Sequence, residues 1–89
     1  MMKTLVLYRP NSEYARSVDE FVHEFKTRSS DKVLEVVNID SREGSHIADL
    51  YGIVQYPAIL VLQGDGFMQK SWEGGTLPLV DEVLGYTRA

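Results

Sequence analysis

The chain has 89 residues, of which 44% are hydrophobic and 25% are charged, which is the composition of an ordinary globular domain. Its net charge of −4 argues against a nucleic-acid partner, because binding to phosphates requires a cationic face. The short apolar run near the N-terminus is too brief for a signal peptide or a membrane span. We therefore expect a single cytoplasmic domain over residues 1–89, with no membrane partner. The absence of cysteine excludes dithiol–disulfide oxidoreductase chemistry by this polypeptide.

The spacing of the apolar residues predicts a strand and then a helix in the first third of the chain. The run from Thr4 to Tyr8 is apolar on both faces, as in a central strand of a sheet. The amphipathic helix that follows should end near Arg28. Two starts fit the sequence, a direct cap by Ser12 or a capping box that begins at Ser17. We favour the start at Ser12 because Tyr14 continues the apolar stripe of the helix.

A second strand and a short helix come next. The segment from Val33 to Ile39 is rich in β-branched residues, which favours a strand. A helix is predicted from about Ser45 to Tyr51, with Gly52 as its left-handed C-terminal stop. Because glycine disfavours helix, Gly44 places the preceding residues in a loop. The predicted inner face of this helix is Ile47, Leu50 and Tyr51.

The last third of the chain predicts a β-hairpin and a helix. The apolar run from Ala58 to Leu62 indicates a buried strand, and the sequence from Gln63 to Gly66 is typical of a hairpin turn. The returning strand should run from Phe67 to Trp72, with the tryptophan packed under the last helix. That helix should begin near Thr76–Pro78, because proline is tolerated in the first turn. Its predicted inner stripe is Val80, Val83, Leu84 and Thr87.

The predicted elements occur in the order strand, helix, strand, short helix, strand, strand, helix. The first two strands are joined by a crossover helix and are therefore parallel, whereas the last two form an antiparallel hairpin. Because crossovers are right-handed, few arrangements remain, and the simplest is a four-stranded mixed sheet in the order 2-1-3-4. The two longer helices would cover one face of this α/β sheet and the short helix the other.

Several short sequences, in this order and spacing, resemble the thioredoxin and glutaredoxin family over nearly the full length of the chain. They lie at the end of the second strand, after the short helix, at the start of the third strand, in the hairpin and after the fourth strand. They are Asn38-Ile39-Asp40, Tyr51-Gly52-Ile53, Tyr56-Pro57, Gly64-Asp65-Gly66 and Gly74. The resemblance implies a thioredoxin-like fold, and the early first strand is more similar to the shorter glutaredoxins.

In that family, the loop after the first strand carries a C-x-x-C motif at the mouth of the first helix. The helix N-terminus lowers the pKa of the first cysteine and thereby favours the thiolate. The matching positions in this chain are Ser12 and Ala15. The resemblance is therefore to a member that lacks the redox cysteines, and it implies no disulfide cycling and no iron–sulfur cofactor held by cysteine.

The resemblance also implies a binding groove between the first loop and the third strand. Its candidate residues are Ser12, Glu13, Tyr14, Tyr56, Pro57 and Gly74. A cis Tyr56–Pro57 bond would turn the backbone N–H and C=O of Tyr56 towards an extended peptide or a glutathione-like ligand. The alternatives are that the proline only shapes the entry of the strand and that Tyr56 packs against Tyr14.

Other residues of the chain leave further interpretations open. Ser12 is either a helix cap or the counterpart of the serine that holds the glutathione thiolate in glutathione transferases. Glu13 is explained by its favourable interaction with the helix dipole. His23 and His46 lie on different predicted helices and indicate neither a Ser-His-Asp constellation nor a metal site. A further alternative is a cysteine-replaced oxidoreductase, with Ser12 and Ala15 in place of native cysteines.

Together, these patterns predict a non-redox binding or adaptor module that uses no cofactor. The expected partner is a protein or a peptide, and glutathione is the alternative ligand. No motif in the sequence indicates a specific enzymatic reaction.

Overall fold

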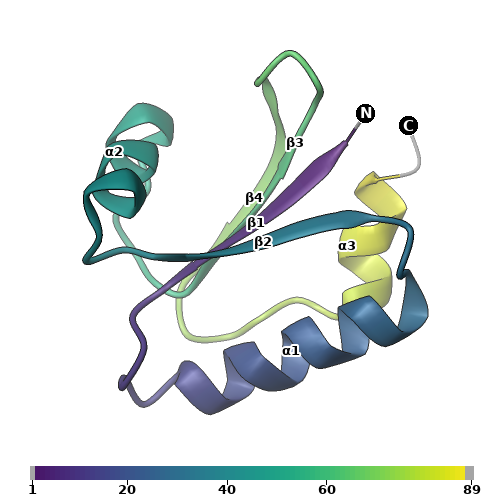
Figure 1. Cartoon of the computed structure of the whole chain (residues 1–89), viewed down its shortest axis with the longest axis horizontal. Helices are drawn as coiled ribbons and strands as arrows, with labels where there is room; N and C mark the ends of the chain where they lie inside the picture. Colours follow the sequence, from purple (N-terminus) through teal and green to yellow (C-terminus); the bar gives the residue numbers. More distant parts are fainter. Residues whose placement is uncertain (1, 88–89) are drawn as a thin grey trace.

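The computed structural model describes residues 2–87, and these residues form a four-stranded sheet with three helices (Figure 1). In chain order, the elements are β1 (Lys3–Tyr8), α1 (Ala15–Arg28), β2 (Val33–Asn38), α2 (Arg42–Tyr51), β3 (Ala58–Leu62), β4 (Met68–Glu73) and α3 (Val80–Tyr86). The strand order is β2-β1-β3-β4, with β1 parallel to β2 and antiparallel to β3, and β4 antiparallel to β3. This arrangement confirms the predicted mixed sheet.

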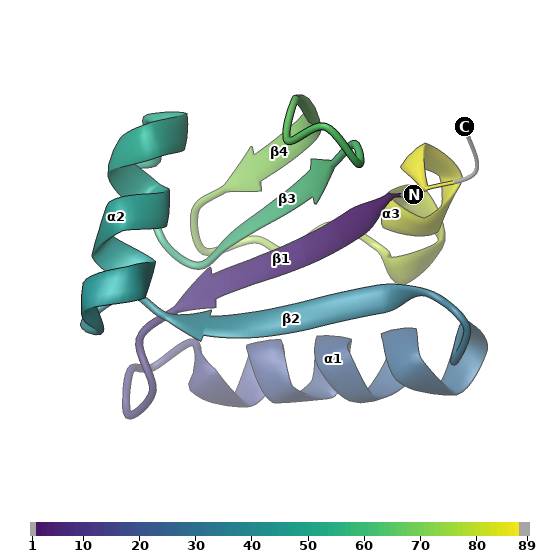
Figure 2. The same ribbon diagram turned by 45° about the horizontal axis from the view of Figure 1, so that its top comes forward.

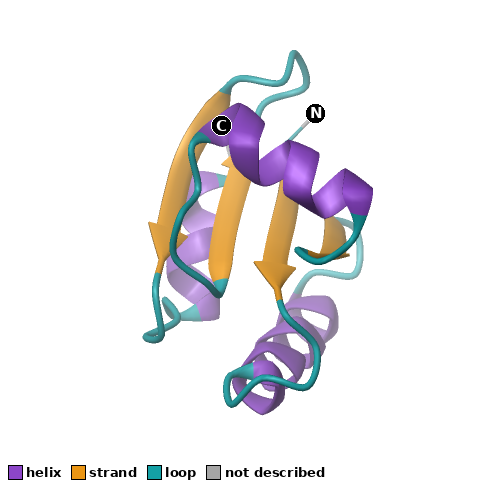
Figure 3. Cartoon of the chain, turned by 90° about the vertical axis from the view of Figure 1, so that its left-hand side faces the viewer, coloured by secondary structure: helices purple, strands orange, loops and turns teal. Residues whose placement is uncertain are grey.

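The helices cover both faces of the sheet (Figure 2 and Figure 3). On one face, Val6 and Ile59 of the sheet form an apolar core with Phe25 of α1 and Val83 of α3. On the other face, Ala48 of α2 packs against the opposite side chains of the same strands. The first and last helices therefore lie on one face and α2 on the other, as predicted, although α2 with 10 residues is longer than α3 with 7.

The two central strands, β1 and β3, are buried on both faces. Leu5 and Leu7 face α2, whereas Val6 between them faces α1 and α3, because side chains alternate along a strand. All five residues of β3 are buried. The continuous apolar runs therefore identified the central strands correctly, since a strand covered on both faces has no solvent side for polar residues.

Thr4 is a polar residue at a fully buried position of β1. Its hydroxyl has no hydrogen-bond partner among the described residues. We expect Thr4→Val to raise the free energy of unfolding by about 1 kcal/mol, because it removes an unsatisfied buried hydroxyl and keeps a β-branched shape. Equilibrium unfolding in urea measures the change. The matched control is Thr76→Val at an exposed loop position, expected to change stability by less than about 0.5 kcal/mol. A loss of stability in Thr4→Val would contradict this account.

Helix α2 begins at Arg42, three residues earlier than predicted, and the loop expected at Gly44 is wrong. Ser41 is the N-cap, and its side-chain oxygen accepts a hydrogen bond from the Gly44 N–H at 2.9 Å. Gly44 is buried against the end of β2, where an added Cβ would lie 2.0 Å from the Asn38 carbonyl oxygen. The close approach that only glycine permits outweighs its low helix propensity here.

The inner face of α2 also differs from the prediction at one position. Leu50 was expected to face the core but is 66% exposed, and Ala48 is buried in its place. Ile47 and Tyr51 pack partly against the core, as predicted. Gly44 and Ala48 are four residues apart and so lie on one face of the helix. These small residues let α2 approach the sheet closely and leave Leu50 turned towards solvent.

Helix α1 begins at Ala15, and the predicted caps at Ser12 and Ser17 are wrong. The N-cap is Tyr14, and no side chain caps the helix. Ser12 instead belongs to a turn, in which its N–H donates to the Arg9 carbonyl and its own carbonyl accepts from the Ala15 N–H, each at 3.2 Å. The backbone of Ser12 is therefore already used in the connection between β1 and α1.

Helix α3 begins at Val80, later than the predicted start near Thr76–Pro78. Its predicted inner stripe of Val80, Val83, Leu84 and Thr87 is buried, as expected. Trp72 of β4 packs against this core, and its ring Nε1–H donates to Glu82 at 3.1 Å. The tryptophan therefore packs beside α3, in agreement with the prediction.

An ion pair joins the end of α1 to the start of α3. Arg28 forms a hydrogen bond to Asp81, and it also pairs with Glu24 one turn earlier in its own helix. The hydrogen bond and the charge of Asp81 raise the pKa of the Arg28 guanidinium. Because these side chains lie in solvent, the pair orients the helices more than it stabilises them.

Candidate functional site

A groove of about 540 Å³ lies between the end of β1, the turn before α1 and the entry to β3. Of the predicted site residues, Ser12, Glu13, Tyr14, Tyr56 and Pro57 line it. Segments far apart in the sequence thus meet at one place, at the end of the sheet where β1 and β2 terminate. Their use in binding stays a prediction.

Two residues identified from the sequence do not line this groove. Gly74 lies behind Pro57 and donates its N–H to the Pro57 carbonyl at 3.0 Å, with a positive φ of 106° that favours glycine. Ala15, which matches the second family cysteine, is the first residue of α1 and is not part of the lining. Gly74 therefore supports the shape of the β3 entry, whereas Ala15 belongs to the helix.

Tyr56 places unpaired backbone groups beside the groove. The Tyr56–Pro57 peptide bond is cis. The Tyr56 ring packs partly against the core beneath α2, and its hydroxyl donates to the Ile53 carbonyl at 3.3 Å. Within residues 2–87, the backbone N–H and C=O of Tyr56 take part in no hydrogen bond. A polar main-chain pair is thus available next to a half-buried aromatic ring.

Tyr14 forms the other wall of the groove. An added Cβ on Gly75 would lie 2.9 Å from Cε1 of Tyr14, so the ring rests directly on the backbone after β4. The aromatic pairs of the described residues involve other rings, Phe21 with Phe25 and Trp72 with Tyr86. Tyr14 therefore does not stack on Tyr56, and the space between these two tyrosines stays open.

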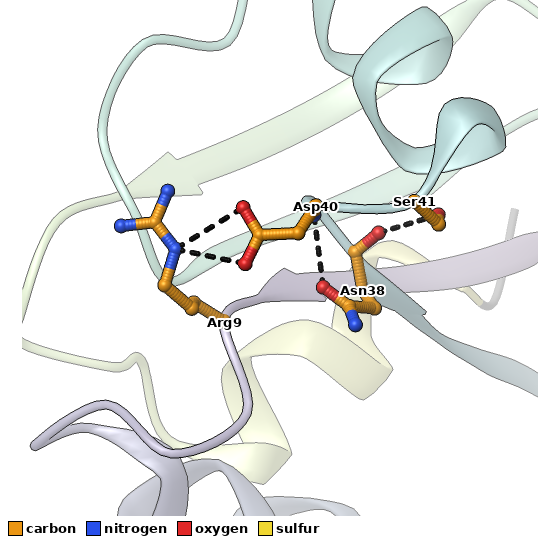
Figure 4. A network of polar contacts seen from close by, with 4 residues as sticks. All are labelled: Arg9, Asn38, Asp40 and Ser41. Atoms are coloured by element: carbon orange, nitrogen blue, oxygen red, sulfur yellow. Dashed lines mark hydrogen bonds and ion pairs between the residues drawn. The ribbon is translucent and has the colours of Figure 1, made fainter.

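A polar network ties the end of β1 to the end of β2 at the rim of the groove (Figure 4). The Nε of Arg9 donates to both carboxylate oxygens of Asp40, at 3.1 and 3.3 Å. The Asp40 N–H donates to Oδ1 of Asn38 at 2.8 Å, and the Ser41 hydroxyl donates to the Asn38 carbonyl at 2.6 Å. Because both charged side chains are more than half exposed, the Arg9–Asp40 pair orients Arg9 but adds little stability.

Three lining residues, Tyr8, Arg9 and Ile39, were not among the predicted site residues. Tyr8 ends β1 and Ile39 directly follows the parallel strand β2, and the Ile39 N–H donates to the Tyr8 carbonyl at 3.1 Å. The signal that could have identified them is topological, because ligands of α/β sheets bind outside the carboxyl ends of parallel strands. With these residues included, the groove has an aromatic and aliphatic floor and charged groups at its rim.

The described lining of the groove contains no Ser-His-Asp arrangement. Neither histidine is part of the groove lining that includes Ser12. His23 is exposed on α1, and His46 is exposed on α2. In residues 2–87, no group of three or more His, Cys, Asp or Glu side chains could hold a metal ion. The polar groups of the lining residues include the Ser12 hydroxyl, the charged side chains of Arg9 and Glu13, and the unpaired main-chain N–H and C=O of Tyr56.

Comparisons with solved structures identify the fold. The structure is similar to the oxidised thioredoxin from Plasmodium falciparum, with a TM-score of 0.77 and 14% identity, over 99% of this chain and 82% of that chain. It is also similar to the thioredoxin of Fasciola hepatica, with a TM-score of 0.74 and 15% identity over 98% of this chain and 79% of that one. Thioredoxin O2 of Arabidopsis thaliana matches with a TM-score of 0.72 and 13% identity, over 96% and 70%.

These likenesses show the fold, and the chain accordingly has a thioredoxin-like fold that carries no cysteine. No protein-family model matches the sequence, and a search among curated proteins finds no relative. No helix within the described part of the chain has the length and apolar character needed to cross a membrane.

Proposed function

We propose that the chain is a non-redox binding or adaptor module, which binds an extended peptide of a partner protein in the groove beside Tyr56. The observation that carries this proposal is the unpaired backbone N–H and C=O of Tyr56 at the entry to β3. An extended peptide can pair with such groups as an added strand, so that its main chain supplies affinity and its side chains supply specificity.

The lining of the groove suits such a peptide. Its volume of about 540 Å³ falls within the usual range of ligand pockets, roughly 300–1,000 Å³. Ile39 and Pro57 are buried and offer an apolar floor, and Tyr14 offers an amphipathic wall of the kind enriched at binding hot spots. Arg9 and Glu13 at the rim carry opposite charges, which favours peptides with an acidic and a basic residue in a defined order.

Selection from a library of random linear peptides, followed by amide chemical-shift mapping, tests this proposal. The selected peptides should shift the amides of Ser12, Tyr14 and Tyr56. Tyr14→Ala should weaken their binding by at least about tenfold, because it removes an aromatic hot-spot contact worth about 2 kcal/mol. Tyr86→Ala, the same substitution on α3, is the control and should leave affinity unchanged. Selected peptides that bind the Tyr14→Ala variant equally well would disprove the groove as their site.

A serine-type glutathione-binding domain is the second candidate function. It is favoured by Ser12, which lines the groove and whose side chain makes no hydrogen bond among the described residues. Titration with glutathione should then give saturable shifts at Ser12 and Tyr56, and the Ser12→Ala variant should lose them. An absence of shifts up to millimolar glutathione would remove this candidate.

The remaining alternative is a cysteine-replaced oxidoreductase. The codons for positions 12 and 15 in the source gene test whether these residues replace native cysteines.

A further inference from the structure

The connection between α2 and β3, residues 52–57, lies beside the end of β4 (Figure 1 and Figure 2). Val54 and Gln55 come directly before Tyr56 in this connection, and both are exposed, so little packing holds them in place. Among the described residues, their main-chain groups form hydrogen bonds only with the side chain of Glu73, the last residue of β4. Glu73 is therefore the main polar tie between this segment and the sheet.

A single carboxylate oxygen of Glu73 accepts both of these hydrogen bonds. Its Oε1 lies 3.1 Å from the main-chain N of Val54 and 3.3 Å from that of Gln55. Successive main-chain N–H groups that converge on one point favour an anion there, and hydrogen bonds to a charged acceptor are stronger than those between neutral groups. The carboxylate thus fixes the two residues that precede Tyr56 without using any polar group of Tyr56 itself.

The residues that hold this segment belong to a rigid part of the sheet. Glu73 pairs with Ala58, the first residue of β3, and the next residue, Gly74, donates its N–H to the Pro57 carbonyl at 3.0 Å. Two neighbouring residues at the end of β4 therefore hold the chain on both sides of Tyr56. Between these two ties, the N–H and C=O of Tyr56 have no partner within residues 2–87.

We propose that Glu73 is a positioning residue of the groove, which holds residues 54 and 55 so that the main-chain N–H and C=O of Tyr56 are fixed in place for an incoming peptide. This role rests on the proposed binding of a peptide in the groove. Glu73 is not among the residues that line the groove, so it acts through Tyr56 rather than by contact with the ligand. A segment that is already ordered loses less conformational entropy on binding, and the carboxylate thereby increases affinity.

Three substitutions of Glu73 test whether its oxygen holds the segment in the free protein. Glu73→Ala removes the acceptor, Glu73→Asp shortens the side chain by one methylene, and Glu73→Gln keeps an acceptor oxygen at the original length. Amide hydrogen exchange at Val54 and Gln55 should become about tenfold faster in the Ala and Asp variants and stay near the wild-type rate in the Gln variant. Exchange at Leu60, in the core of β3, should not change. An unchanged rate at Val54 and Gln55 in Glu73→Ala, or an equal rise at Leu60, would overturn the proposed local role.

The affinity for the selected peptides tests whether this order serves binding. Glu73→Ala should raise their Kd by about tenfold, and Glu73→Gln should bind them nearly as tightly as the wild type, a rescue that requires the acceptor oxygen. Glu20→Ala, which changes an exposed glutamate of α1, is the matched control and should alter neither affinity nor exchange.

The outcomes separate this role from the function on which it rests. Equal affinity of the wild type and Glu73→Ala, together with faster exchange at residues 54 and 55, would overturn the positioning role and leave peptide binding in the groove intact. A wild-type chain that binds no linear peptide would contradict the proposed function, and the role of Glu73 in binding would fail with it.

Discussion

Gly44→Ala is expected to lower the free energy of unfolding by about 3 kcal/mol, the upper end of the usual cost of overpacking. An added Cβ would lie 2.0 Å from the Asn38 carbonyl oxygen, 2.8 Å from its carbonyl carbon and 3.0 Å from the Ile39 Cα. All three atoms belong to the backbone, so no side-chain rotation relieves the clash. The first turn of α2 must move away from β2, and the bond from the Gly44 N–H to Ser41 is lost with it. Equilibrium unfolding in urea measures the loss.

Gly85→Ala in α3 is the matched control for this prediction. Gly85 is exposed, and an added Cβ would meet nothing within 4 Å. The substitution should therefore stabilise the protein by up to about 1 kcal/mol, because alanine is the better helix former. The two glycine-to-alanine changes should thus have opposite signs. A Gly44→Ala variant as stable as Gly85→Ala would show that α2 can shift from β2 at no cost.

Phe25→Ala is expected to cost about 3–5 kcal/mol of unfolding free energy. Phe25 of α1 is fully buried against side chains of the sheet and of α3, and its ring centroid lies 6.2 Å from that of Phe21. Removing the ring leaves a cavity in the core that the sheet forms with α1 and α3. Domains are typically stable by only about 5–15 kcal/mol, so the variant should melt far below the wild type. Thermal unfolding followed by circular dichroism measures this effect.

Phe67→Ala provides the same chemical change at the surface. Phe67 follows the hairpin turn and is 71% exposed, so its truncation should change stability by no more than about 0.5 kcal/mol. A comparable loss in both variants would contradict the assignment of Phe25 to the core and of Phe67 to solvent.

The elements that sequence patterns identified well are those whose signals are local and strong. The unbroken apolar run of β3 predicted a strand buried on both faces, and all of its residues are buried. Gly52 ends α2 with a left-handed φ of 68°, as expected for a glycine after the last helical turn. The sheet order followed from these elements because the handedness of crossovers leaves few topologies.

The errors occurred where contacts with neighbouring backbone override the preference of a single residue. Gly44 is a poor helix former, yet it lies in the first turn of α2 because the backbone of Asn38 leaves no room for a side chain. Serine is a preferred residue at helix N-caps, but the backbone of Ser12 takes part in a turn and α1 starts at Ala15. Helix propensities and capping preferences describe a segment in isolation and contain no information about these neighbours.

The candidate site was predicted in part for the same reason. Ser12, Tyr14 and Tyr56 were identified through a family resemblance, which compares positions in a known fold. Tyr8 belongs to no motif, and the motif that contains Ile39 indicated only the end of a strand. The parallel pairing of β1 with β2 brings the two residues to the same rim. A residue whose contribution is its location cannot be recognised by its type.

The sequence by itself determined the sheet, the order of its strands and the absence of any thiol, because alternation, turn residues and composition are properties of the chain. Only the tertiary structure decided that an open groove exists between Tyr14 and Tyr56. Tyr14 rests on Gly75 and Tyr56 packs beneath α2, so the two rings stand apart rather than filling the space between them. Such contacts join residues far apart in the chain, and they exist only once the packed core has fixed their positions.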